Sequence, residues 1–315
     1  MSARTTEVLP TDEAGIARAV ELLAAGNVVA LPTETVYGLA ADASDARAVA
    51  RIYEAKGRPS FNPLIVHVSG LSMAQTLVEV PRAALDLMAR FWPGPLTLVL
   101  PLRPGAPIAG LVTAGLPTLA VRCPDHPVTQ AVIAALGRPI AAPSANASGR
   151  ISPTRAEHVV ASLDGRIPLV LDAGPTRAGL ESTIVAIDGD AVRLLRPGAV
   201  PAEHLGLPVQ AASPTTINAP GQLASHYAPA QPVRLKAASA EPGEFHIGFG
   251  GVAGDRSLSP AGDLVEAAAN LFDLLHAAEA SGRPRIAVAP IPEEGLGVAI
   301  NDRLRRAAAP RGESA

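Results

Sequence analysis

The chain has 315 residues, 48% of them hydrophobic, which is enough for one large or two ordinary domains with buried cores. Because 29 acidic residues slightly outnumber 26 basic ones, general electrostatic capture of nucleic acid is not expected, and any anion site must be a local cluster. The single cysteine, Cys123, excludes an intramolecular disulfide framework and a metal site built from several thiolates.

The first 200 residues alternate short β-branched runs with helical patterns, which predicts an α/β domain. Predicted helices cover residues 16–25, 45–56, 82–91 and 128–136. Predicted strands cover residues 28–31, 64–68, 96–100, 119–122, 140–141, 169–171, 182–187 and 191–195. The last two strands are predicted to be joined by a hairpin turn at 188–190, and all of them fit one mixed sheet with helices.

A change of composition divides the rest of the chain. Residues 207–232 are rich in proline and show no hydrophobic period, so we expect a linker or lid there, after a first domain at 1–206. Predicted strands at 233–235, 245–249 and 285–289 and a periodic helix at 264–279 then indicate a small second α/β domain over 233–315. We expect the tail beyond Arg306 to be frayed.

Several familiar signatures are missing from the sequence. It has no GxxxxGK[ST] phosphate loop, no HExxH motif and no GxSxG elbow. Residues 248–253 satisfy GxGxxG/A after a predicted strand, but a polar stretch follows instead of a helix, which favours a turn over a dinucleotide site. The start resembles no secretory signal and no apolar run reaches roughly 18 residues, so we expect a cytoplasmic protein without a membrane span.

Three polar segments follow predicted strands or helices. In LPTETVYGL (31–39), threonines and a glutamate come directly after a strand, where ligands of open α/β sheets bind; a hydrogen-bonded turn explains the segment equally well. In PSANASG (143–149), small polar residues permit close approach of the backbone to an anion, although turn chemistry alone accounts for them.

The remaining segment, KGRPSFNPL (56–64), carries the strongest charge. Lys56 and Arg58 lie at the end of a predicted helix, where cations complement the helix dipole, but they also suit a polyphosphate because prolines restrain the loop after them. Arg122 and Arg196 each end a strand and would complete a ring of cations. His67, on the next strand, is more typical of a hydrogen-bonded core histidine than of a catalyst.

Taken in order, six segments resemble one known family. LPTETVYGLA, KGRPSFNPL, VRCP, APSANASG, ESTIV and LRPG, spread over about residues 28–198, resemble the YrdC-type threonylcarbamoyl-AMP synthases, and APGQLASHYAP and IPEEGLGVAINDRLRRAA are similar to the long, two-domain form. The resemblance implies a twisted α/β sheet with a cationic concave cleft and a smaller C-terminal α/β domain. It also implies synthesis of L-threonylcarbamoyladenylate from L-threonine, bicarbonate or CO2, and ATP with release of pyrophosphate, the first step of N6-threonylcarbamoyladenosine formation at position 37 of tRNA.

The resemblance also assigns residues by motif. It implies an L-threonine pocket lined by Thr35, His67, Arg122, Ala142 and Ser182. It implies that ATP is held by Lys56, Arg58, Asn62, Thr118, Ser144, Asn146, Ser152 and Arg196, with Tyr227 of the linker closing over it. Lys56 and Arg58 would act in catalysis by offsetting charge on the triphosphate, and Arg122 would pair with the threonine carboxylate. The linker departs from the family pattern at 222–225, where the family carries a methionine and basic or aromatic residues.

Other partners follow from the same resemblance. Mg2+ is expected to accompany ATP, held mainly by phosphate oxygens and water, with no metal-ligating side chain assigned. The product would pass to a threonylcarbamoyl-transferase machinery that acts on tRNA. The alternative from another class is an RNA- or tRNA-binding module that uses the cationic cleft without adenylating activity. Few aromatic residues and an acidic balance make tight nucleic-acid binding unexpected, which favours the enzyme.

Overall fold

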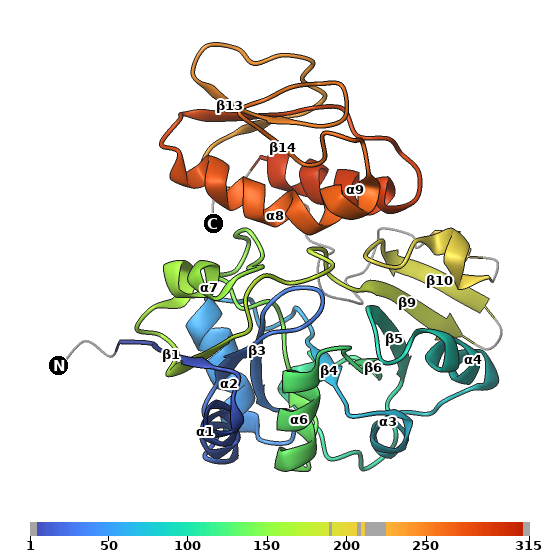
Figure 1. Ribbon diagram of the computed structural model, residues 1–315. Coiled ribbons are helices and arrows are strands. Elements are labelled where there is room, and N and C mark those ends of the chain that lie inside the picture. Colours follow the sequence, from blue (N-terminus) through green and yellow to red (C-terminus); the bar gives the residue numbers. More distant parts are fainter. Residues whose placement is uncertain (1–4, 189–190, 207–208, 212–224, 311–315) are drawn as a thin grey trace.

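The computed structural model describes residues 5–188, 191–206, 209–211 and 225–310. These residues form two packed units (Figure 1): a large unit, from residue 5 to 211, around an eleven-stranded sheet, and a small unit, from 225 to 310, around a four-stranded sheet. The predicted fold class, a mixed sheet with helices plus a smaller C-terminal α/β unit, is confirmed.

The large sheet is mixed, with both parallel and antiparallel neighbours. Its strands are β1 Glu7–Pro10, β2 Val29–Leu31, β3 Gly38–Asp42, β4 Ile65–His67, β5 Leu96–Pro101, β6 Thr118–Arg122, β7 Ile140–Ala141, β8 Leu169–Asp172, β9 Thr183–Asp188, β10 Ala191–Arg196 and β11 Val209–Ala211. They lie in the order β1-β8-β2-β3-β7-β4-β6-β5-β9-β10-β11. Strands β4 and β6 are parallel, and their last residues, His67 and Arg122, are paired in register. Both residues therefore lie at the same edge of the sheet.

Helices cover the large sheet. They are α1 Glu13–Ala24, α2 Ala46–Lys56, α3 Leu71–Leu77, α4 Arg82–Phe91, α5 Gly110–Thr113, α6 Pro127–Leu136 and α7 Ala156–Leu163, with a short 3₁₀ turn at Ala202–Leu205. Helix α2 shows why the sequence signals worked. The Asp45 carboxylate accepts from the amides of Arg47 and Ala48, and Gly57 ends the helix with φ 59°. Because α2 ends at Gly57, Lys56 and the loop that follows it lie beside the sheet.

The small unit is a parallel α/β layer. Its elements are β12 Val233–Arg234, β13 Glu244–Gly248, β14 Arg256–Ser257, α8 Leu264–Ala280, β15 Arg285–Val288 and α9 Leu296–Ala308, and its strand order is β12-β15-β13-β14. Helices α8 and α9 lie between the small sheet and the large unit (Figure 1). The expectation of a frayed tail beyond Arg306 is wrong for the two residues directly after it, because α9 continues to Ala308 and buries Ala307. Residues 311–315 of that tail lie outside the described residues.

Other elements were not predicted from the sequence. Strand β3 has the sequence GLAAD, without a β-branched residue, yet every position is buried between β2 and β7. Strand β11 pairs in parallel with β10 inside the segment expected to be a linker. Residues 189–190 of the predicted hairpin turn and residues 207–208 and 212–224 of the predicted linker lie outside the described residues.

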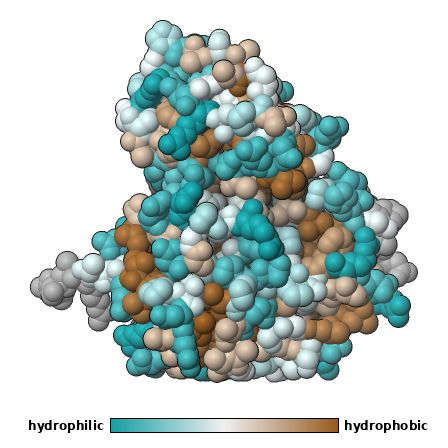
Figure 2. All heavy atoms as spheres, in the orientation of Figure 1, coloured by the Kyte–Doolittle hydropathy of each residue, from teal (hydrophilic) through white to brown (hydrophobic). Residues whose placement is uncertain are grey.

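One hydrophobic cluster spans the two units, beside the large unit's own core. Val36 and Leu180 of the large unit pack in the same cluster as Phe272 and Ile300 of the small unit. Ion pairs border this cluster, including Arg155 Nε to Asp273 Oδ1 at 2.5 Å. In the described part of the chain, none of the helices combines the length and hydrophobicity that a membrane span needs. Figure 2 shows hydrophobic side chains in separate groups among hydrophilic ones on this face.

Candidate active site

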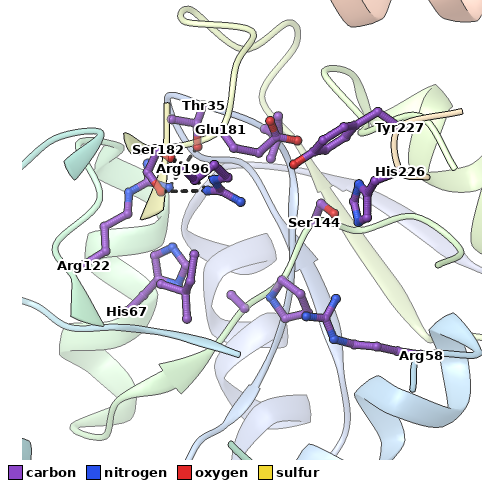
Figure 3. Close-up of a pocket in the computed structure, with 14 residues that line it drawn as sticks. Thr35, Arg58, His67, Arg122, Ser144, Glu181, Ser182, Arg196, His226 and Tyr227 are labelled. Atoms are coloured by element: carbon purple, nitrogen blue, oxygen red, sulfur yellow. Dashed lines mark hydrogen bonds between the residues drawn. The ribbon is translucent and has the colours of Figure 1, made fainter. Parts of the chain in front are cut away.

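A pocket opens where several strands of the large sheet end and the small unit meets them (Figure 3). It brings together nine of the residues singled out in the sequence: Thr35, Arg58, His67, Arg122, Ala142, Ser144, Ser182, Arg196 and Tyr227. Five further residues line it: Val36, Ile65, Pro143, Glu181 and His226. The pocket therefore joins motifs that lie almost 200 residues apart in the chain.

One end of the pocket is formed by the carboxyl ends of β4 and β6. The Arg122 guanidinium lies 2.6 Å from Glu34 Oε1 through Nη2 and donates to Thr35 Oγ1 at 3.0 Å through Nη1. Arg122 is 4% exposed, so this ion pair is buried. The direction of the guanidinium is fixed by two hydrogen bonds, the one to Thr35 and one from Nε to the Gly94 carbonyl at 3.3 Å, while Nη2 faces Glu34 without a hydrogen bond. The sequence marked Glu34 only as part of the polar segment 31–39 and assigned it no partner or role.

His67 lies beside Arg122 at the same end of the pocket. Neither ring nitrogen has a hydrogen-bond partner among the described residues, although the side chain is 2% exposed. This geometry does not fit the alternative of a hydrogen-bonded core histidine. Burial, and then the nearby Arg122 charge, hold the pKa of His67 well below its usual value, so the imidazole is neutral. A neutral ring offers a substrate one donor and one acceptor.

The opposite end of the pocket carries Arg58 and, behind it, Lys56. Arg58 donates to the carbonyl oxygens of Asn62 at 3.2 Å and Pro63 at 2.9 Å, and burial lowers its pKa to about 10. Lys56 donates through Nζ to the carbonyls of Ser144 and Asn146, which ties the end of α2 to the 143–149 loop. Burial, and then the charge of Arg58, hold the pKa of Lys56 well below its usual value.

Arg196 ends β10 between these two ends. Its guanidinium donates to the Ser182 carbonyl at 2.9 Å and to Ser182 Oγ at 3.2 Å. Burial lowers the pKa of Arg196. The next turn packs closely: a Cβ added to Gly198 would lie 2.4 Å from both the Glu181 carbonyl oxygen and the Thr183 amide nitrogen. The turn after β10 is thus pressed against the residues that start β9.

Not every predicted residue reaches the pocket wall. Lys56, Asn62, Asn146 and Ser152 are buried next to lining residues, and Ser152 donates to the carboxylate of Glu181. Thr118 begins β6 and borders a separate cavity with Arg193 and Leu195. It is four residues from Arg122 along the strand, about 13 Å, so the structure does not bring Thr118 to the pocket.

The small unit closes the pocket with His226 and Tyr227. Tyr227 is 1% exposed and has φ 60°, a left-handed conformation that is uncommon outside glycine. Its ring lies edge-on to His226 at 4.0 Å, and its hydroxyl has no hydrogen-bond partner among the described residues. Burial raises the pKa of Tyr227 and holds that of His226 well below its usual value. The sequence motif quoted for the linker contained both residues.

The pocket is therefore rich in buried cations. Three arginines line it and Lys56 stands directly behind, whereas Glu181 is the one carboxylate among its lining residues. Among the described residues, no three histidine, cysteine, aspartate or glutamate side chains converge in a way that could hold a metal ion. Such a site suits an anion with several charges and a smaller molecule beside it.

The chain matches two family models. One, described as "Telomere recombination", covers residues 21–198, and the other, described as "Threonylcarbamoyl-AMP synthase, C-terminal domain", covers residues 181–309. Threonylcarbamoyl-AMP synthase of Bacillus subtilis is 42% identical, with 97% of this chain and 96% of that protein covered. The chain belongs to the threonylcarbamoyl-AMP synthase family. The resemblance drawn from the six motifs is thereby confirmed.

Relatives in the family extend the match. Threonylcarbamoyl-AMP synthase of Pyrococcus abyssi is 41% identical over 90% of both chains. The crystal structure of Pyrococcus abyssi Sua5 complexed with L-threonine has a TM-score of 0.88 and 38% identity, covering 96% of this chain and 98% of that one. Escherichia coli YciO, at 23% identity and a TM-score of 0.55, shares the fold of 61% of this chain.

Proposed function

We propose that the chain synthesises L-threonylcarbamoyladenylate from L-threonine, bicarbonate or CO2, and ATP, with release of pyrophosphate. The observation that carries the proposal is the pocket that Arg58, Arg122 and Arg196 line together. The pocket belongs to a chain of the threonylcarbamoyl-AMP synthase family. The product would then supply the threonylcarbamoyl group of N6-threonylcarbamoyladenosine at position 37 of tRNA.

The reaction needs positioning and charge neutralisation more than a nucleophilic side chain. The threonine amine adds to CO2, loses a proton and becomes a carbamate. A carbamate oxygen then attacks the α-phosphorus of ATP, and the bond to the β-phosphate oxygen breaks, so pyrophosphate leaves. A pocket that excludes water also protects the carbamate and the mixed anhydride from breakdown.

We assign the end of the pocket at β4 and β6 to L-threonine. Arg122, held by its hydrogen bonds to Thr35 and Gly94, would receive the substrate carboxylate, with Glu34 beside it. The neutral His67 ring, with two nitrogens to offer, suits the threonine hydroxyl or the carbamate. Ala142 and Ser182 would shape the niche around the methyl group.

We assign the other end to ATP. Lys56, Arg58 and Arg196 would offset the charge that builds up on the triphosphate. Ser144, Asn146, Asn62 and Ser152 are the neutral groups around them, and the side-chain oxygens of Asn62 and Asn146 are buried without a described hydrogen-bond partner. Thr118 is left out of this assignment because it borders a different cavity.

Mg2+ would be held mainly by the triphosphate and water. The carboxylate that lines the pocket, Glu181, already binds Arg303 and Ser152, and the described residues offer no cage of acidic side chains. This donor set fits an ion that keeps most of its water. Bound there, Mg2+ would neutralise phosphate charge and favour departure of pyrophosphate.

We also propose the division of labour along the chain. Residues 1–206 would form the catalytic domain, 207–232 a linker that carries Tyr227 over ATP, and 233–315 a small C-terminal domain. The enzyme would work in the cytoplasm and pass its product to a threonylcarbamoyl-transferase machinery that acts on tRNA.

One assay tests the proposed function. The protein is mixed with ATP, Mg2+, bicarbonate and each amino acid singly, and pyrophosphate is measured. We expect release that depends on both threonine and bicarbonate. Equal release without an amino acid would exclude the proposal. A gel-shift measurement with tRNA tests the RNA-binding alternative, which requires tight binding without adenylate formation.

A further inference from the structure

Arg303 is a buried arginine in the small unit. It lies on the inner face of α9, between Ile300 and Leu304, and its side chain is 0% exposed. Taking a guanidinium out of water costs several kcal/mol unless charged and hydrogen-bonding partners compensate. Its partners therefore decide what the residue does.

The partners of Arg303 lead to the pocket. Its Nε donates to Glu181 Oε2 at 2.7 Å, and its guanidinium carbon lies 5.0 Å from the centre of the Tyr227 ring. A further bond goes to its neighbour Asp302 at 2.7 Å. Glu181 and Tyr227 both line the pocket, next to each other in Figure 3, whereas Arg303 does not. Arg303 thus reaches the pocket through two other side chains.

The ion pair changes the charge that the pocket presents. Glu181 lies close enough to both Arg303 and Arg196 for each to lower the pKa of its carboxyl. Arg303 and Ser152 occupy the two carboxylate oxygens from outside the pocket. Without Arg303, Arg196 would be the remaining cation beside Glu181. The Glu181 carboxylate would then offset the charge of Arg196, which would be less available to a triphosphate.

Arg303 also holds the aromatic wall. The Tyr227 ring has the Arg303 guanidinium on one side and packs against Phe272 of α8, with ring centres 5.6 Å apart. A backbone φ of 60° is strained for a residue with a side chain, and it persists only where the surroundings enforce it. Arg303 and Phe272 both belong to the small unit. The backbone beside Tyr227 is held from both units, because the His226 amide donates to the Arg306 carbonyl and the Ala228 amide donates to the Gly149 carbonyl.

We propose that Arg303 is a positioning residue of the ATP site, which fixes Glu181 and Tyr227 at the pocket wall and keeps the charge of Arg196 directed at the triphosphate. The inference rests on the proposed function and adds to it a role for the small unit. It makes the C-terminal helix part of the nucleotide site without any contact to nucleotide.

The test compares two arginines of the same helix. Arg303→Met removes the buried charge, and Arg305→Met removes an exposed arginine paired with Glu293 at 3.1 Å. Calorimetry measures the Kd for ATP, and steady-state rates give KM and kcat for both substrates. We expect Arg303→Met to raise the Kd for ATP at least about tenfold while the KM for threonine changes little. Arg305→Met is expected to match the unsubstituted protein.

A second substitution separates positioning from simple loss of stability. In Glu181→Gln/Arg303→Met the uncompensated carboxylate is gone, so we expect tighter ATP binding than in Arg303→Met alone. Where Arg303→Met does not fold, Arg303→Gln keeps a hydrogen-bond donor without the charge and carries the same comparison. An unchanged Kd in the Arg303 variants, or a double variant that binds no tighter, overturns the inference.

The result also distinguishes the inference from the proposed function. Threonine-dependent pyrophosphate release by the unsubstituted protein, together with normal ATP binding by Arg303→Met, overturns the inference alone. An unsubstituted protein that binds no ATP overturns both.

Discussion

The two ends of the pocket hold their cations differently. At the β4–β6 end, Arg122 faces the Glu34 carboxylate at 2.6 Å. At the α2 end, Lys56 and Arg58 donate to backbone carbonyls, and neither forms an ion pair with a described carboxylate. One end therefore has an arginine whose charge is partly offset by a carboxylate, and the other has buried cations that no described carboxylate offsets and whose pKa values burial lowers.

This difference matches the charges of the two proposed substrates. A single carboxylate on a small zwitterion needs a guanidinium held in one direction, which the hydrogen bonds of Arg122 to Thr35 and Gly94 supply, while Glu34 offsets part of its charge. A triphosphate carries several negative charges, which would balance the positive charges of cations that the fold already holds away from water. We therefore expect the end with the ion pair to determine which amino acid binds, and the end without one to provide the attraction for the triphosphate.

The largest expected effect is at the unpaired end. Arg58→Ala removes a cation from the pocket wall, and Lys56→Ala removes the buried charge behind it that ties α2 to the 143–149 loop. Loss of charge stabilisation at the transferred group is worth about 2–4 kcal/mol, so we expect activity to fall at least tenfold in either variant. Pyrophosphate release measures the loss, and circular dichroism checks folding. Lys236→Ala, at the chain's other lysine, is exposed and serves as the control. Folded variants of Lys56 and Arg58 with normal turnover would mean that the two cations only cap a helix.

Selectivity is expected at the paired end. Serine lacks the methyl group of threonine, and an apolar niche discriminates one methyl by about 1–3 kcal/mol, so serine should be a poor but detectable substrate. Valine leaves the partners of the hydroxyl unpaired and should be rejected more strongly. Relative kcat/KM values check this, and a preference for valine over serine would contradict the assignment.

A smaller effect is expected where the small unit closes the unpaired end. Tyr227→Ala removes a buried ring from the pocket wall, and we expect a several-fold higher KM for ATP and faster hydrolysis of the product in place. Tyr227→Phe keeps the ring and should retain most of the activity. Product yield over time measures both. An alanine variant with unchanged yield and KM would show that Tyr227 closes nothing.

The smallest expected effect is a dependence on pH. The pKa of Lys56 is held well below that of an ordinary lysine, so its charge is present at low pH and is lost as pH rises through that lowered value. ATP affinity should therefore weaken as the pH rises through that lowered value, whereas Arg58, with a pKa of about 10, stays charged at pH values below its own. Calorimetry in buffers of different ionisation enthalpy should show proton uptake on binding. Lys56→Arg should flatten the dependence of ATP affinity on pH. An equally steep dependence in that variant would mean that a group other than Lys56 causes it.

Much of the large unit could be predicted from local patterns. Helix α4 begins and ends at Arg82 and Phe91 as its hydrophobic period indicates, and Asp45 and Gly57 bound α2 as cap residues do. The strand ends at Arg122 and Arg196 also followed from composition. Local signals were sufficient there because each element's own residues decide where it stops.

Contacts between distant residues could not be predicted in the same way. Glu181 and Arg303 are 122 positions apart, and nothing local marks them as partners. Thr118 and Arg122 show the converse, since both belong to β6 but lie at opposite ends of the strand, so closeness in sequence does not place them in one site. Strand β3 forms because burial outweighs its weak strand preference.

Gly198 shows how little mutational freedom this architecture leaves at one point. Its Cα rests against the backbone of Glu181 and Thr183, where even one added carbon would collide. A Gly198→Ala change would push apart the chain segments that carry Ser182 and Arg196, although the glycine contacts no substrate in the proposed reaction. Substitutions can accumulate at exposed residues around the pocket. At Gly198, one added methyl group would separate the segment that carries Ser182 from the segment that carries Arg196.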